Sequence, residues 1–170
     1  MALEPSVGQR VSRRQWALWA AYAAFGWAAL FAALSFFWAA GGRTGLQPLE
    51  QVGGGNAALW ALVNVFAGLA KLGGGALAII LVRMRQETRG ARLLGWLLLV
   101  GGVGMCLYGG IGLISDALHV SGVINDPATR KWFFYYLVLW DPWWALGGAL
   151  FTATALLSRP VHAKVAIATH

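Results

Sequence analysis

Four long apolar stretches dominate this chain, at residues 16–40, 57–82, 93–115 and 132–158. Each has at least about the 20 residues that an α-helix needs to cross the hydrocarbon core of a bilayer. Hydrophobic residues make up 59% of the chain, which is more than is usual for soluble proteins. Charged residues make up 11%, which is far less than is usual. The sequence therefore predicts an all-α, integral membrane four-helix transmembrane bundle that forms a single membrane domain over residues 1–170.

Basic residues near the ends of these stretches are distributed unevenly. One set of loops and tails holds Arg10, Arg13, Arg14, Arg83, Arg85, Arg89, Arg92, Arg159 and Lys164, whereas the opposite loops hold Arg43, Arg130 and Lys131. Because basic residues near membrane spans stay in the cytoplasm, we expect both termini inside, as short basic tails. This is the topology of a multi-pass protein of the cell (inner or plasma) membrane. The basic face would also attract anionic lipid headgroups.

Several biochemical classes are disfavoured by the composition. The formal net charge of +7 does not indicate nucleic-acid binding, since the basic residues flank apolar segments instead of forming a polar surface interleaved with aromatics. Cys106 is the only cysteine, so neither an intramolecular disulfide nor a cysteine-based zinc site can form. We find no catalytic signature, metal-ligand cluster or nucleotide loop, and we expect no cofactor.

Lys71 and Asp141 each interrupt an apolar stretch. A charge at bilayer depth costs about 2.5–3.5 kcal/mol on insertion scales, so ionisable residues there usually have a partner or a function. Counted from the outer ends of their helices, the two alpha carbons differ in depth by about 7 Å, a distance that a lysine stem can largely cover. We hypothesise an ion pair between them, with Asn64 and water as possible intermediaries, at a buried polar centre.

Small residues recur on one face of three stretches, which is the pattern that lets membrane helices approach closely. The faces are Asn64, Gly68, Lys71 and Gly75; Gly102, Cys106 and Gly110; and Asp141, Ala145, Gly148 and Thr152. Helix contact is the simpler interpretation of all three. The run Gly73-Gly74-Gly75 also leaves open a broken helix of the kind that transporters use near the midplane.

The last stretch begins with a belt of aromatic residues and then reads Trp140-Asp141-Pro142-Trp143-Trp144. Pro142 lacks an amide hydrogen and disfavours helical dihedrals at the preceding residue, so we expect a kink or a restart there. Asp141 would then be a helix N-cap, which is compatible with a functional role. Trp140 and Trp144 could contribute aromatic faces to a ligand site.

The Trp140-Asp141-Pro142-Trp143-Trp144 segment, followed by Gly147-Gly148, resembles the signature of a family of uncharacterised small bacterial four-helix membrane proteins. The resemblance covers about residues 16–157. It implies a helical membrane fold and no activity, so no catalytic residue can be carried over from it.

Asp116 and His119 form a second polar pair, at the outer end of the third stretch. Their spacing of three places them on one helix face. Solvation at the membrane interface is the simpler interpretation. The alternative is an outward-facing pair of proton acceptors, since histidine titrates near physiological pH.

Three functional classes remain open. We favour a non-catalytic integral membrane protein that binds a small apolar or cationic ligand or assists a membrane complex. The first alternative is a membrane-embedded acid/base enzyme that acts on a lipid-soluble isoprenoid, sterol-like or quinone substrate. The second is transport of protons or small solutes by a homo-oligomer, because one four-helix bundle leaves little room for an aqueous path.

Overall fold

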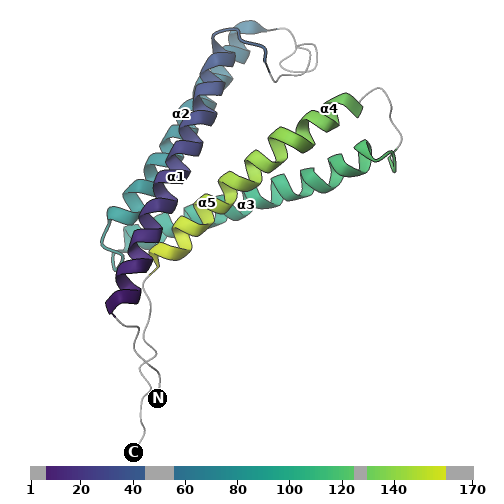
Figure 1. The fold of residues 1–170 in the computed structure, drawn as a ribbon. Helices are drawn as coiled ribbons and strands as arrows, with labels where there is room; N and C mark the ends of the chain where they lie inside the picture. Colours follow the sequence, from purple (N-terminus) through teal and green to yellow (C-terminus); the bar gives the residue numbers. More distant parts are fainter. Residues whose placement is uncertain (1–6, 45–55, 125–129, 160–170) are drawn as a thin grey trace, which may run out of the picture.

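A computed structural model describes residues 7–44, 56–124 and 130–159, and every regular element in these ranges is helical (Figure 1). The elements are α1 (Val7–Ala39), α2 (Ala57–Arg83), α3 (Arg89–Val120), α4 (Arg130–Tyr135), the π-helical turn η2 (Tyr136–Trp140) and α5 (Asp141–Ser158). The predicted all-α class is confirmed. Three helices, α1, α2 and α3, are long and apolar enough to cross a membrane.

Local signals in the sequence explain where several helices begin and end. The side chains of Asn56 and Thr88 cap α2 and α3 by accepting hydrogen bonds from the amides of Leu59 and Ala91. Past the end of α1, Gly41 takes a positive φ of 93°, a conformation that a glycine adopts without steric cost. The helices are therefore bounded by residues whose chemistry suits those positions.

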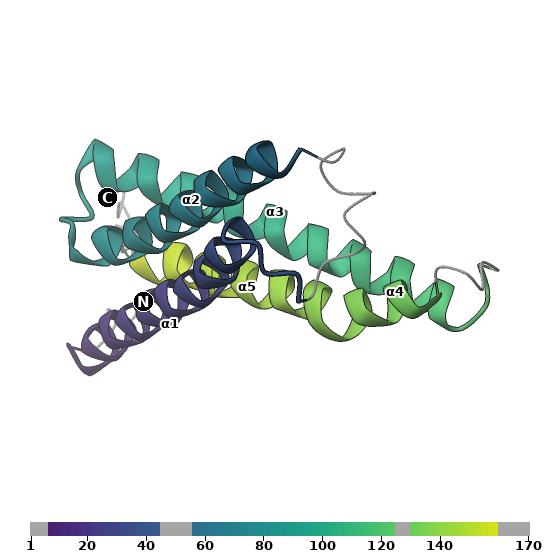
Figure 2. The same ribbon diagram turned by 90° about the horizontal axis from the view of Figure 1, so that it is seen from above.

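The helices form two antiparallel hairpins, α1 with α2 and α3 with α4, η2 and α5, which meet mainly through α1 and α5 (Figures 1 and 2). The hairpins touch near the end where α1 begins and diverge toward the opposite end, as Figure 1 shows. The four-helix bundle predicted from sequence is therefore not confirmed as such, because the two hairpins separate toward one end.

The first hairpin is held by small residues, as predicted for α2. Gly68 packs against the ring of Phe36, and a Cβ atom on Gly75 would lie 3.0 Å from that of Ala28. Ala28 belongs to a series of buried alanines along α1, together with Ala17, Ala21, Ala24 and Ala32. Helix α2 runs without interruption through Gly73-Gly74-Gly75, so the broken-helix alternative is wrong.

The second hairpin brings the backbones of α3 and α5 into close contact. A Cβ atom on Gly102 would lie 2.7 Å from the amide nitrogen of Thr152, and one on Gly148 would lie 2.6 Å from the carbonyl oxygen of Gly102. The predicted α5 face is therefore the contact face. On α3 the contact runs through Gly109 and Gly112, whereas Gly110 faces open space.

The last apolar stretch is a continuous helical segment with a π-helical turn in its middle. Asp141 has helical dihedrals, φ −67° and ψ −46°, and its amide donates to the carbonyl of Tyr136, five residues earlier. The expected N-cap at Asp141 is therefore wrong. The wider turn accommodates Pro142 without a break, since a proline ring otherwise clashes with the carbonyl four residues before it.

Basic residues occur in the sequence where α1 begins, where α2 connects to α3 and where α5 ends. Figure 1 shows these three places at one end of the molecule, which we call the basic end. Arg13 donates a 2.9 Å hydrogen bond to the carbonyl oxygen of Leu156, and Arg83 donates one of 3.0 Å to the hydroxyl of Tyr22. Lys164 and most of the predicted tails lie outside the described residues. The basic end contains most of the positions expected in the cytoplasm.

Candidate functional site: buried polar groups and a groove between the hairpins

The side chain of Lys71, in α2, contacts two residues of α1. Its amino group donates a 2.9 Å hydrogen bond to the hydroxyl of Ser35, which is completely buried, and lies 4.3 Å from the centre of the Phe31 ring. The contacts that the structure gives to the Lys71 amino group therefore come from α1 and not from Asp141. The structure does not confirm the predicted ion pair between Lys71 and Asp141.

Asp141 faces α3 instead. Its side chain is only 4% exposed and packs directly against the backbone at Gly112. The side chain of Asp116 is also buried, with 8% exposed, and its carboxyl group is close enough to that of Asp141 to interact with it. A hydrogen bond between two carboxyl groups would need a proton on one of them, because a carboxylate has no hydrogen to donate.

One carboxyl oxygen of Asp141 lacks a hydrogen-bond partner. This atom, Oδ2, is buried and has no such partner in the described part of the chain. Two ionised carboxylates that are brought close together in a buried site repel each other. We call Asp116 and Asp141 the carboxyl pair.

The remaining predicted polar residues have local partners. Asn64 is 5% exposed and donates a 2.9 Å hydrogen bond to the carbonyl of Trp60, one turn earlier in α2. His119 Nδ1 lies 2.8 Å from the carbonyl oxygen of Ser115, and its ring stacks on Phe133 at 3.9 Å. Asp116 and His119 thus contact different groups, and Asp116 is buried, not at a solvated interface.

A cluster of aromatic rings joins the two hairpins. The indole nitrogen of Trp27 in α1 donates a 2.9 Å hydrogen bond to the carbonyl of Trp143 in α5. The Trp27 ring lies flush on Gly147, where any larger residue would displace it, while Gly148 faces α3. Other close ring pairs are Phe31 with Trp144 at 5.1 Å, Trp38 with Trp140 at 5.5 Å and Phe31 with Trp140 at 6.0 Å.

Beside this cluster lies a groove of about 450 Å³, formed between α1 and the η2–α5 segment. We call it the hairpin groove. Its lining is almost entirely apolar and consists of Leu30, Phe31, Ala33, Leu34, Phe37, Leu139, Trp140 and Trp143. Of the residues proposed from sequence, Trp140 lines this groove, whereas Trp144 lies behind it against Phe31 and Tyr108.

Sequence reasoning missed two residues that contact Lys71 and assigned the wrong neighbour to Asp116. Ser35 and Phe31 hold Lys71 but look like ordinary members of an apolar stretch. Asp116 was singled out for its neighbour His119, although its contact is with Asp141 across the hairpin. The sequence signal that could have revealed the neighbour of Asp116 is Gly112, which lies one turn earlier on α3. A glycine there leaves space for a side chain from another helix.

The hairpin groove allows contact with an apolar ligand. Among the described residues, no group of three or more histidine, cysteine, aspartate or glutamate side chains could hold a metal ion.

Three helices are long and apolar enough to cross a membrane, which indicates a helical membrane protein. A family model described as "Protein of unknown function (DUF3995)" matches residues 28–151, more than half of the chain. The chain therefore belongs to that family, which confirms the resemblance to an uncharacterised family. No curated protein and no solved structure matches it.

Proposed function

We propose that this protein is a non-catalytic, multi-pass membrane protein that binds a small apolar, membrane-soluble molecule in the hairpin groove. In this proposal four helical segments span the cell membrane, with the basic end in the cytoplasm. The groove then lies where the two hairpins begin to diverge, within the depth of the bilayer. The observation that carries the proposal is the groove itself, with its volume of about 450 Å³ and its apolar lining.

The chemistry of the groove supports an apolar occupant. Trp140 packs against Trp38, and Phe31 packs against Trp144, so the aromatic wall is supported by further rings before any ligand arrives. Preformed apolar cavities of a few hundred cubic ångströms are typical of small-molecule sites. A charged ligand finds no counter-charge among the eight lining residues. Of the apolar and cationic ligands that the sequence left open, the groove favours the apolar one.

The test is native mass spectrometry of the full chain, purified in mild detergent, with a variant that fills the groove. Ala33→Trp places a bulky ring in the groove, whereas Ala23→Trp adds the same ring at an exposed position of α1 that does not line it. We expect an apolar molecule to be retained by the wild type and by Ala23→Trp. The amount retained by Ala33→Trp should fall about tenfold, as expected for overpacking of a site.

Three results would contradict this proposal. The first is equal retention by the two tryptophan variants, because the bound molecule would then sit elsewhere. The second is a dimer with no bound molecule that Ala33→Trp converts to a monomer, because the groove would then be an interface between two copies. The third is a monomeric wild type that retains nothing.

A second function, proton exchange across the membrane, is favoured by the carboxyl pair alone. Buried carboxyl groups inside membrane helices are typical of proton relays. The test uses protein in liposomes that contain a pH-sensitive dye, followed after an imposed pH step. Proton flux above that of empty liposomes should be lost in Asp141→Asn and kept in Glu87→Gln, which removes an exposed carboxylate. Wild-type flux equal to that of empty liposomes would rule this function out.

A further inference from the structure

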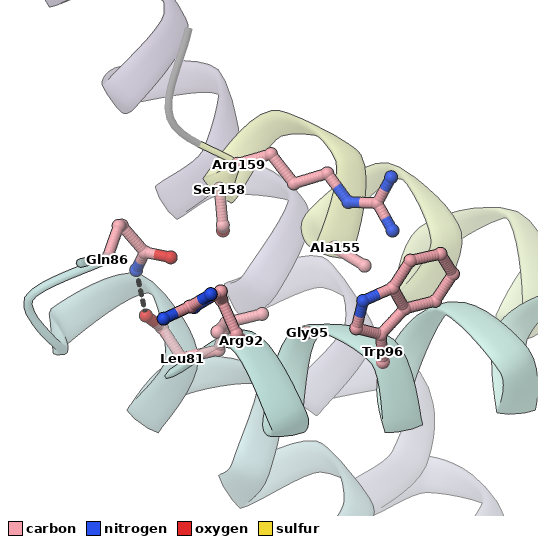
Figure 3. Close-up of a pocket in the computed structure, with 8 residues that line it drawn as sticks. All are labelled: Leu81, Gln86, Arg92, Gly95, Trp96, Ala155, Ser158 and Arg159. Carbon is pink, nitrogen blue, oxygen red and sulfur yellow. Dashed lines mark hydrogen bonds between the residues drawn. The ribbon is translucent and has the colours of Figure 1, made fainter. Parts of the chain in front are cut away.

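A second pocket, separate from the hairpin groove, lies at the basic end, and we call it the basic pocket (Figure 3). Its volume is about 290 Å³, and it is formed where the end of α2, the beginning of α3 and the end of α5 come together. The lining residues are Leu81, Gln86, Arg92, Gly95, Trp96, Ala155, Ser158 and Arg159.

The lining is positively charged. It contains Arg92 and Arg159 and no acidic side chain. The guanidinium carbon of Arg159 lies 4.5 Å from the centre of the Trp96 ring, and Figure 3 shows this side chain extended over the indole. Stacking on an aromatic ring leaves the edge of a guanidinium group free to donate hydrogen bonds in the plane of the fork.

Two polar groups of the pocket have no partner in the described part of the chain. They are the hydroxyl of Ser158, in a side chain that is only 9% exposed, and Nη2 of Arg159, and both atoms are buried. Buried donors are normally hydrogen-bonded, so unpaired donors that line a pocket indicate a missing acceptor. Gln86 is different, because its amide nitrogen already donates to the carbonyl oxygens of Leu81 and Met84.

We propose that the basic pocket binds a phosphate group, held by the guanidinium group of Arg159 and the hydroxyl of Ser158. Arg92, which points toward Gln86 in Figure 3, adds positive charge on the other side of the pocket. A planar guanidinium fork matches two phosphate oxygens, and a hydroxyl can donate to a third. The pocket lies at the helix ends, where the headgroups of a bilayer would be found if α2, α3 and α5 cross it. The phosphate can therefore belong to an anionic lipid or to a soluble molecule, and the two sources share this chemistry.

The experiment measures binding of two named probes to the purified full chain by native mass spectrometry. The probes are phosphatidylglycerol, with phosphatidylcholine as the lipid control, and inorganic phosphate. Each is titrated against wild type, Arg159→Gln, Ser158→Ala and Arg85→Gln. Arg85 is exposed in the same connection and does not line the pocket, so Arg85→Gln removes the same charge without touching the site.

Loss of a charged hydrogen-bond donor should weaken binding about tenfold or more in Arg159→Gln, and loss of the hydroxyl should weaken it about threefold to tenfold in Ser158→Ala. Arg85→Gln should stay close to wild type. Binding of phosphatidylglycerol that inorganic phosphate does not displace identifies a lipid headgroup as the source. Binding of inorganic phosphate alone identifies a soluble one.

The proposal is overturned if neither probe binds the wild type, or if Arg159→Gln and Arg85→Gln weaken binding equally, since general surface attraction would then explain it. Helical content by circular dichroism shows whether Arg159→Gln still folds after losing its contact with Trp96. If it does not fold, Ser158→Ala decides the question, because unchanged binding in that variant also overturns the proposal.

Discussion

The carboxyl group of Asp141 lies directly against the backbone of Gly112, so that a single Cβ atom at position 112 would overlap it. The side chain from α5 is thus accommodated by a missing side chain on α3. This relationship explains how an aspartate can be 96% buried between two helices that are in close backbone contact. It also brings Asp141 to Asp116, one helical turn further along α3.

Gly112→Ala should destabilise the second hairpin. The added methyl group must displace the Asp141 carboxyl or separate the helices, and overpacking of this kind typically costs about 1–3 kcal/mol. Thermal unfolding of the purified protein in detergent, followed by circular dichroism, measures the effect. Gly110→Ala is the matched control, because a Cβ atom there meets nothing within 4 Å. Equal unfolding temperatures for the two variants would contradict the packing described for Gly112.

The carboxyl pair predicts different outcomes for two substitutions of Asp116. Asp116→Asn keeps a group that can donate a hydrogen bond to Asp141, so we expect a change in unfolding free energy below about 1 kcal/mol. Asp116→Leu leaves Asp141 buried without a partner and should cost about 1–3 kcal/mol. Chemical denaturation in mild detergent measures both. If leucine is tolerated as well as asparagine, the two carboxyl groups do not interact.

Lys71 and Ser35 should be energetically coupled, and Lys71 and Asp141 should not. A double-mutant cycle with Lys71→Met and Ser35→Ala should give a coupling of about 0.5–3 kcal/mol, since the two side chains share a hydrogen bond to a charged group. The same cycle with Lys71→Met and Asp141→Asn should be additive within about 0.5 kcal/mol. Coupling between Lys71 and Asp141, together with additivity between Lys71 and Ser35, would instead support the ion pair expected from sequence.

The proposed orientation predicts which loops a membrane-impermeant maleimide can reach. In a Cys106→Ala background, Glu87→Cys should react only from the cytoplasmic side and Arg43→Cys only from the outside, because the positive-inside rule places the α2–α3 connection in the cytoplasm. Labelling of intact cells and of inverted vesicles makes the measurement. Reaction of Glu87→Cys in intact cells would show that the orientation in the membrane is opposite to the one proposed. It would not contradict the fold.

The order of the helices and most of their boundaries could be predicted from sequence because each depends on a local property. Long apolar stretches exclude other structures in lipid, and Asn56 and Thr88 are capping residues in the right places. The contact faces of α2 and α5 could likewise be predicted from the helical spacing of their small residues. The N-cap expected at Asp141 was wrong because a π-helical turn, which has no simple sequence signal, absorbs Pro142.

By itself, then, the sequence determined the helical class, the apolar spans and the positions that need small residues, since these follow from the period of one helix and from its length. Only the tertiary structure decided that Lys71 contacts Ser35 and that Asp141 contacts Asp116. The reason is geometric, because pairing between helices depends on which faces meet and at what depth. Helical spacing determines the faces of each helix but not the neighbour that each one meets.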